Sequence, residues 1–362
     1  MFTEWSWVVG LLIGAAVGSF LNVVIYRMPR GISLSNPSKS FCPKCKHPLG
    51  WLDLVPLLSW LILRGRCRHC GEPVSARYFF VEVVTGLAWA GIWWQYLVVG
   101  SDPAKAIFFA LGASALVAVI FIDWELYLIP DQVNAFLLFV GLAYNGRLAY
   151  ERSPQATTWG VPSSVAGALV GVGALWGIAL VGRLLFRKDA MGHGDIKLAR
   201  GIGAILFPGT AAMSFGLAVA LGAVLGIVQV IAMKPGADQE EAGEQEAPIE
   251  PESVGSLLWC GLGYLLCIDV IGLFWRKLYI RWFGEDPFTP VQDMPEFEVE
   301  RTMIPFGPYL ALGAILATVF QAQLLGGWNA YSDWVRGGHA ALEHSSLAMS
   351  LIVRGVSRLP SG

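Results

Sequence analysis

Charged residues are scarce in this chain of 362 residues: they make up 14% of it, against 55% hydrophobic residues. Soluble domains carry about 25% charged residues, so the chain lacks the charge that covers a water-exposed surface. A net charge of −2 and the lack of a long basic tract argue against nucleic acid as a partner. The composition therefore predicts a membrane protein whose main environment is the lipid bilayer.

Cysteine is scarce too, with six residues, which is too few for a disulfide scaffold at this length. The pattern Gly-x-Gly-x-x-Gly after a strand is also missing, so no Rossmann dinucleotide site is predicted. What the sequence does contain is a series of long apolar runs.

These runs are long enough to cross a bilayer, which takes about 20 apolar residues in a helix. An eighth, shorter run at 196–210 starts with Lys197 and Arg200 and could span only with local thinning or snorkelling. The sequence predicts an all-α polytopic membrane protein with about eight transmembrane helices and a small cytoplasmic zinc-binding loop domain. The seven clear candidates are residues 6–26, 78–100, 104–122, 133–150, 164–186, 211–233 and 304–326.

The loop at residues 28–77 carries eight Lys and Arg residues against two acids. The positive-inside rule makes this loop cytoplasmic. Counting crossings from it places the turns at 123–132 and 187–195 on the same cytoplasmic side. Two separate turns that bear aspartates are thus expected at one membrane face.

Four cysteines of this loop form two chelating pairs, Cys42-x2-Cys45 and Cys67-x2-Cys70. Each pair can place two thiolates on one tetrahedral ion, and closed tetrathiolate sites fold small loops that lack a core. The alternatives are two disulfides or four reduced thiols, and a reducing cytoplasmic side disfavours disulfides. We predict a structural zinc ion held by these cysteines.

The chain is predicted to consist of six segments. An apolar run at 253–275 is expected to be interfacial or re-entrant, because a full crossing would reverse the side of everything after it. The segments are a first transmembrane helix (1–27), the zinc-binding subdomain (28–77), a transmembrane catalytic core (78–233), an acidic cytoplasmic insertion (234–303), a last transmembrane helix (304–326) and a C-terminal tail (327–362).

Two aspartates lie at the ends of apolar runs on the predicted cytoplasmic side, where ionisable groups are costly and tend to serve a function. Asp123 ends one apolar helix, and Asp195 follows Gly192-His193-Gly194 and opens another. Taken singly, Asp123 is explained as a boundary residue and Asp195 as a helix cap. Brought together, two carboxylates share a proton, one acting as base on water and the other as acid toward a carbonyl oxygen.

Other acidic residues have simpler interpretations. Asp131 is predicted to cap the helix that follows Pro130, and Asp189 is predicted to be solvated. Glu82, one turn into the second span, is either a buried polar contact or a snorkelling side chain. His193 is interpreted as a turn residue.

Five ordered motifs resemble those of the type IV prepilin peptidase family, bacterial membrane aspartyl proteases that process pilins and type II secretion pseudopilins. They are Gly18-Ser19-Phe20-Leu21-Asn22, the Cys-Pro-x-Cys pair at 42–45, Arg64-Gly65-Arg66-Cys67-Arg68-His69-Cys70, Asp123 with Leu128-Ile129-Pro130-Asp131 and Gly192-His193-Gly194-Asp195-Ile196-Lys197, and Ile304-Pro305-Phe306-Gly307-Pro308.

The resemblance implies an inner-membrane peptidase whose catalytic aspartates are Asp123 and Asp195, facing the cytoplasm. It implies cleavage of prepilin or pseudopilin leaders at the cytoplasmic membrane boundary. Because family members with the cysteine loop are often bifunctional, it also implies methylation of the new N-terminus with S-adenosylmethionine. The family's short link before the Ile-Pro-Phe-Gly-Pro motif is replaced here by residues 234–303.

Three rival interpretations remain open at this point. An ion-coupled membrane transporter would use the carboxylates as a proton relay, but it predicts them deep within broken spans. A zinc-bearing assembly scaffold would have no chemistry at the aspartates. A presenilin-like peptidase would differ only in its substrates.

Overall fold

The computed structural model describes residues 3–36, 39–42, 44–187, 191–232, 252–293, 305–334 and 336. The chain divides into two compact units, Met1–Val319 and Phe320–Gly362. Asp189, the acidic run at 238–250 and the tail beyond 336 lie outside the described residues.

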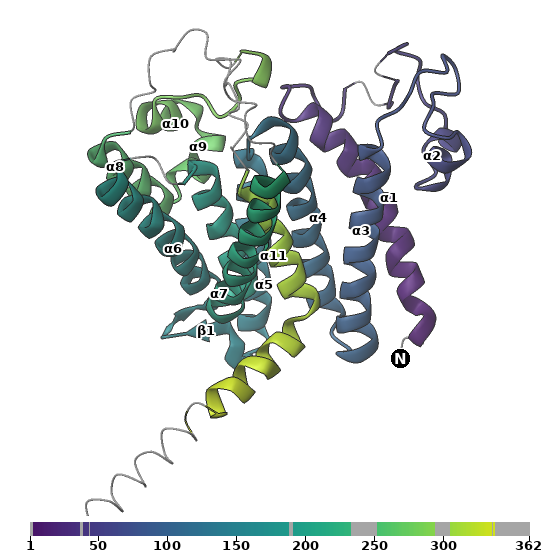
Figure 1. Ribbon diagram of the computed structural model, residues 1–362. Helices are drawn as coiled ribbons and strands as arrows, with labels where there is room; N and C mark the ends of the chain where they lie inside the picture. Colours follow the sequence, from purple (N-terminus) through teal and green to yellow (C-terminus); the bar gives the residue numbers. More distant parts are fainter. Residues whose placement is uncertain are drawn as a thin grey trace, which may run out of the picture. The chain divides into compact units, whose positions relative to one another are not determined.

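The first unit is built of long helices that lie side by side (Figure 1). The only strands among the described residues form a short hairpin between residues 157 and 162. The long helices are α1 (Trp7–Arg27), α3 (Arg77–Trp93, continued by the π-helical turn η3, Trp94–Val99), α4 (Pro103–Leu126), α5 (Asp131–Tyr150), α6 (Ser163–Phe186), α7 (His193–Ala232) and α11 (Gly307–Val319). The hairpin strands are β1 (Thr157–Thr158) and β2 (Val161–Pro162).

The predicted helical membrane fold is confirmed in its main features. Four helices are long and apolar enough to cross a bilayer, and up to six spans result if two bent helix pairs each count as one. This count is lower than the eight spans predicted, although α3 and α5 also cover predicted runs. The four helices are Glu4–Arg27, Pro103–Leu126, Ser163–Phe186 and His193–Val228.

The helix α7 is interrupted at Phe207, where the backbone is non-helical with φ 62° and Pro208 follows. Gly194, in the first half, packs on Ile129, and Ile129 also contacts Gly307. Gly222, in the second half, faces the ring of Phe306. Both ends of α7 thus lie near the start of α11, so residues 193–206 and 208–232 run in opposite directions, and the predicted short run at 196–210 forms a helical segment of its own.

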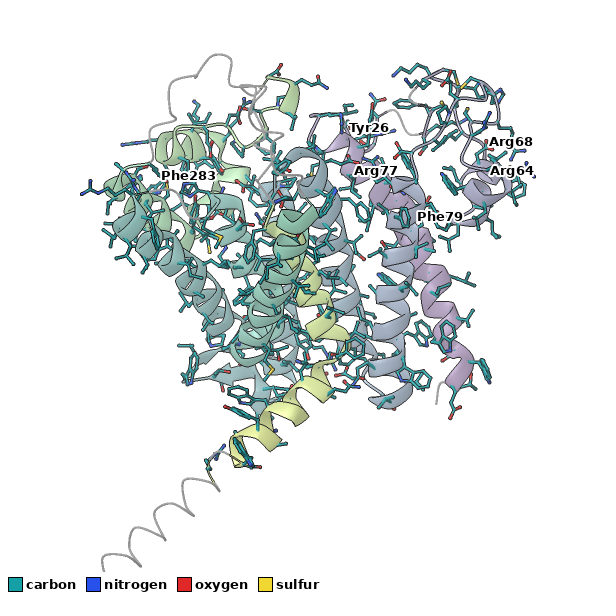
Figure 2. All side chains as sticks on the ribbon, viewed as in Figure 1. Tyr26, Arg64, Arg68, Arg77, Phe79 and Phe283 are labelled. Carbon is teal, nitrogen blue, oxygen red and sulfur yellow. The ribbon has the colours of Figure 1, made fainter. Side chains whose placement is uncertain are left out.

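The cysteine loop and the helices of the insertion lie at the same end of this unit, opposite the N-terminus (Figure 1). The basic residues Arg64, Arg68 and Arg77 gather at this end, as does Phe283 of the insertion (Figure 2). The loop contains the short helix α2 (Leu58–Ile62) and the turn η2 (Trp51–Asp53). The insertion forms α8 (Val254–Leu265), α9 (Ile268–Phe274), α10 (Arg276–Phe283) and the turn η6 (Val291–Asp293).

The insertion is anchored to the transmembrane helices by a buried ion pair. Arg200 of α7 donates to both carboxylate oxygens of Asp269 in α9, at 2.8 and 2.5 Å, and to the carbonyl of Tyr264 in α8 at 2.8 Å. Both charged side chains are 2% exposed. Arg200 thus binds one residue in each of two consecutive helices, and the axes of these helices, α8 and α9, differ in direction by 68°.

Candidate active site

Asp123 and Asp195 line one cavity of about 890 Å³ at this end of the first unit. Asp123 lies in the last turn of α4 and is 5% exposed, whereas Asp195 lies in the first turn of α7 and is half-buried. The structure therefore brings these two boundary aspartates, 72 positions apart in the sequence, to the wall of one cavity.

Asp123 is held by the first residue of α11. The backbone of Gly307 lies against its carboxylate. A Cβ atom at position 307 would lie 2.5 Å from Oδ2 of Asp123 and 2.8 Å from Ile129, so only glycine permits this approach. The sequence motif around Gly307 had no assigned role, and the structure gives it one.

Asp195 is held by the turn that precedes α7. Gly192 lies against its carboxylate, since a Cβ atom at position 192 would lie 3.3 Å from Oδ2. The other oxygen, Oδ1, is buried and has no hydrogen-bond partner in the described part of the chain. Buried acceptors are normally paired, so Oδ1 is available for a water or a substrate group in the cavity.

The prediction that Asp131 caps α5 is wrong. The N-cap residue is Pro130, and Asp131 is the first residue of the helix itself. The Asp131 carboxylate instead accepts two hydrogen bonds from Lys197 Nζ, at 2.9 and 3.0 Å. Tyr279 of α10 donates to the same carboxylate and accepts from Lys197 at 3.1 Å. These three residues form a buried polar cluster on the wall of the cavity.

The insertion closes one side of the cavity with residues 285–289. This segment is fastened on two sides, because Val291 N–H donates to the Pro29 carbonyl at 2.9 Å and Gln132 Nε2 donates to the Pro287 carbonyl at 3.4 Å. The exposed Arg276 pairs with Asp286 and keeps the pKa of that carboxyl below its usual range. No sequence pattern predicts these contacts, because the residues are far apart along the chain.

His193 is more than a turn residue. It begins α7 and bridges the insertion, with Nε2 2.8 Å from Glu252 Oε2 and Nδ1 2.8 Å from the Tyr264 hydroxyl. Cys260 completes a group whose possible ligand atoms all lie within 4.8 Å of one another. The hydrogen bonds already satisfy both nitrogens of His193, so these contacts are interpreted as part of the anchoring of the insertion.

The four cysteines of the loop come together as predicted, with their sulfur atoms within 4.8 Å of one another. Cys42 and Cys67 start two identical turns: Cys42 N–H donates to the carbonyl of His47 and Cys67 N–H to that of Glu72, five residues on. Backbone hydrogen bonds from Cys70 and His69 lower the pKa of the Cys67 thiol to about 7, whereas desolvation and the neighbouring thiols raise the pKa of Cys70. None of the chain's cysteines forms a disulfide. Four thiols at this spacing fit a tetrahedral zinc ion.

Comparison with known proteins agrees with this division into a cysteine loop and an aspartate site. The profile described as "Bacterial Peptidase A24 N-terminal domain" matches residues 12–96, which contain the four cysteines. The profile described as "Type IV leader peptidase family" matches residues 110–227, which contain Asp123 and Asp195. A relative in Myxococcus xanthus, named "Prepilin leader peptidase/N-methyltransferase", is 33% identical over 88% of this chain and 89% of its own length. The chain belongs to the type IV leader peptidase family.

Further members of this family carry the same name. A relative in Klebsiella pneumoniae is 39% identical over 54% of this chain and 82% of its own length. One in Aeromonas hydrophila is 32% identical over 75% of this chain and 91% of its own length. No solved structure matches the chain. The resemblance seen in the five sequence motifs is thus confirmed.

Proposed function

We propose that this member of the type IV leader peptidase family is a membrane aspartyl endopeptidase in which Asp123 and Asp195 are the catalytic pair. The observation that carries the proposal is the meeting of these two carboxylates, far apart in sequence, on one cavity. Neither carboxylate forms an ion pair with a Lys or Arg among the described residues, whereas Asp131 pairs with Lys197. Both therefore remain available for proton transfer.

The chemistry requires one proton shared by the pair. The ionised carboxylate takes a proton from water, and the resulting hydroxide bonds to the carbonyl carbon of the scissile peptide. The protonated carboxyl donates to the carbonyl oxygen, and collapse of the tetrahedral intermediate breaks the C–N bond while the amide nitrogen gains a proton. The pair titrates as a unit, so the base is not assigned to either aspartate.

The substrates are the leaders of type IV prepilins or pseudopilins, as the relatives' name indicates. The cavity lies at the same end as the basic loop, which the positive-inside rule places in the cytoplasm. Cleavage therefore takes place at the cytoplasmic boundary of the inner membrane. About eight membrane-crossing segments follow if α3, α5 and both halves of α7 cross in addition to α1, α4, α6 and α11.

A structural zinc ion on Cys42, Cys45, Cys67 and Cys70 holds the loop together. The loop has few buried side chains of its own, so metal binding supplies its folding free energy. The relatives' name also includes N-methyltransferase activity, and we extend it to this chain, with S-adenosylmethionine as methyl donor.

The test is co-expression with a candidate prepilin, followed by mass spectrometry of the pilin. Wild-type chain is expected to remove the leader and to add a methyl group, whereas Asp123→Asn and Asp195→Asn each abolish cleavage without changing membrane insertion. Full processing by either purified variant removes that residue from the pair. If the aspartate variants behave like the wild type while the cysteine variants lose function, the scaffold interpretation is favoured. Proton-coupled flux in vesicles that contain the chain would favour the transporter interpretation.

A further inference from the structure

The turn that precedes Asp195 has little conformational restraint of its own. It consists of Gly192-His193-Gly194, so that glycine lies on both sides of its single side chain. Glycine loses more conformational freedom on folding than any other residue. A defined position for the Asp195 carboxylate therefore depends on contacts that hold this turn, and His193 is the side chain of the turn that can make them.

Both ring nitrogens of His193 are bonded to the insertion. An ionised carboxylate only accepts hydrogen bonds, so Nε2–H of His193 donates to Glu252 Oε2 at 2.8 Å. In the neutral ring, Nδ1 then accepts from the Tyr264 hydroxyl, also at 2.8 Å. Bonds at both nitrogens fix the rotation of the ring and its tautomer. Since His193 also lines the cavity of the two aspartates, the insertion holds part of the cavity wall in place.

Glu252 is itself fixed in position. Its other carboxylate oxygen, Oε1, accepts a hydrogen bond from the Ser256 hydroxyl in the first turn of α8. Its backbone carbonyl accepts one from the guanidinium group of Arg183, in the last turn of α6. The bond from His193 to Glu252 therefore joins the glycine-flanked turn to two helices.

Tyr264 of α8 contacts three polar residues along α7. It is 2% exposed, and besides its hydroxyl contact with His193 its backbone carbonyl accepts from Arg200 at 2.8 Å. The Nζ atom of Lys197 lies 5.3 Å from the centroid of its ring. Positions 193, 197 and 200 are four and three residues apart, so they share one face of the helix. One residue of the insertion thus contacts this face over its first two turns.

The same face is held by two further rings of the insertion. The Nζ atom of Lys197 lies 5.6 Å from the ring centroid of Tyr279 and 5.5 Å from that of Phe283. An ammonium group within about 6 Å of an aromatic ring is attracted to its face. Asp195 lies between His193 and Lys197 along the chain, so a shift of this face of α7 moves the Asp195 carboxylate.

We propose that Glu252 and Tyr264 are positioning residues of the peptidase: they hold His193, and through it they set the place of the Asp195 carboxylate relative to Asp123. The proposal rests on the role of Asp195 in the proposed function. The insertion is then a part of the active site that catalysis requires. Because neither residue contacts the substrate, their loss lowers turnover more than substrate binding.

The test measures kcat and KM of prepilin cleavage by the purified full-length chain in detergent. Tyr264→Phe removes the hydroxyl and keeps the ring. It is expected to lower kcat by about tenfold, because displacement of a catalytic group by about 1 Å costs up to about 100-fold, and to change KM by less than about twofold. Glu252→Gln is expected to lower kcat several-fold with the same small effect on KM.

Variants of His193 test the route of the effect. The amide of His193→Asn takes the place of Nδ1 and can keep the bond to Tyr264, so this variant is expected to retain more activity than His193→Ala. If Tyr264 acts through His193, Tyr264→Phe combined with His193→Ala loses no more kcat than His193→Ala alone. Additive losses in the double variant would overturn the proposal.

Tyr96→Phe is the matched control for Tyr264→Phe. Tyr96 is 5% exposed, and its hydroxyl donates to the Thr318 carbonyl at 2.7 Å. It does not line the cavity of the two aspartates. The change removes a buried tyrosine hydroxyl elsewhere in the helices, and it is expected to lower the unfolding temperature but to keep wild-type kcat.

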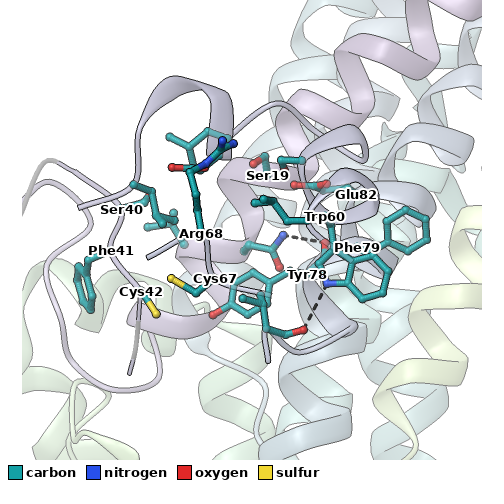
Figure 3. A pocket seen from close by; sticks show the side chains of 18 of the residues that line it. Ser19, Ser40, Phe41, Cys42, Trp60, Cys67, Arg68, Tyr78, Phe79 and Glu82 are labelled. Carbon is teal, nitrogen blue, oxygen red and sulfur yellow. Dashed lines mark hydrogen bonds and ion pairs between the residues drawn. The ribbon is translucent and has the colours of Figure 1, made fainter. Parts of the chain in front are cut away.

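Glu82→Gln is the matched control for Glu252→Gln. Glu82 of α3 is 8% exposed and lines a second cavity, of about 160 Å³, between the cysteine loop and the ends of α1 and α3 (Figure 3). Its Oε2 accepts from Leu57 N–H at 2.7 Å, so Glu82 is a buried polar contact and does not snorkel. The two cavities share no lining residue, so Glu82→Gln is expected to keep wild-type kcat.

Thermal unfolding shows which variants are folded, and only folded variants are compared. The His193 side chain is 39% exposed, so its variants are expected to fold even if Tyr264→Phe does not. Equal losses in His193→Asn and His193→Ala, or wild-type kcat in Tyr264→Phe and Glu252→Gln, would overturn the positioning role while Asp195→Asn stays inactive. Full cleavage by Asp195→Asn would instead refute the proposed function.

Discussion

The carboxylate of Asp123 lies against the Cα of Gly307, at a place where an added methyl group would come within 2.5 Å of Oδ2. Asp123 lies in the last turn of α4, and Gly307 begins α11, so the contact joins the transmembrane core to the segment that follows the insertion. The geometry of the catalytic pair therefore depends on a residue that has no ionisable side chain.

We expect Gly307→Ala to lower the rate of prepilin cleavage by about 100-fold, because displacement of a catalytic group by about 1 Å has effects of that size. The measurement is the rate of leader removal by the purified variant. Gly173→Ala is the control, since a Cβ atom there meets nothing within 4 Å. Equal rates for the two variants would show that Gly307 does not position Asp123.

We expect Tyr279→Phe to reduce both stability and cleavage. Tyr279 is 1% exposed, and the change removes its hydrogen bonds with Asp131 and Lys197 at the wall of the cavity. The loss of stability should be about 1–2 kcal/mol, measured by thermal unfolding in detergent, and cleavage should fall several-fold. Tyr150→Phe, at a side chain that is 91% exposed, should change neither quantity. A Tyr279→Phe variant that behaves like this control would contradict the role of the cluster.

Asp269→Asn should detach the insertion, because it leaves the buried guanidinium of Arg200 without its counter-ion. Breaking such a pair costs about 3–5 kcal/mol, and limited proteolysis should cut the insertion faster than in the wild type. Glu151→Gln breaks the part-exposed pair with Arg147 and should change stability by less than about 0.5 kcal/mol. Unchanged proteolysis in Asp269→Asn would mean that other contacts hold the insertion.

Cys67→Ser should reduce bound zinc from one ion per chain to almost none, as measured by elemental analysis of the purified protein. The reason is that a closed tetrathiolate site loses affinity when one ligand is replaced. Cys260→Ser, at the group near His193, should leave one zinc ion per chain. Full zinc content in Cys67→Ser would rule out the predicted site.

The sequence was sufficient to predict features that depend on composition and local spacing. Scarce charge and repeated apolar runs predict membrane helices, because a bilayer leaves few alternatives for a long apolar segment. The spacing of Cys42, Cys45, Cys67 and Cys70 predicts one cluster, because each pair is confined to a tight turn. Charge asymmetry also placed Asp123 and Asp195 at the same face, although not in contact.

Only the tertiary structure decided how the two aspartates are held and what surrounds them. The approach of Gly307 to Asp123, the pairing of Asp131 with Lys197 and Tyr279, and the burial of Arg200 against Asp269 all join residues far apart in sequence. Such contacts depend on how helices pack, and although the small residues that allow close packing in lipid recur at four-residue spacing, that spacing does not say which helices or which polar side chains meet. For the same reason, a residue expected to cap a helix, Asp131, instead pairs with a lysine from another one.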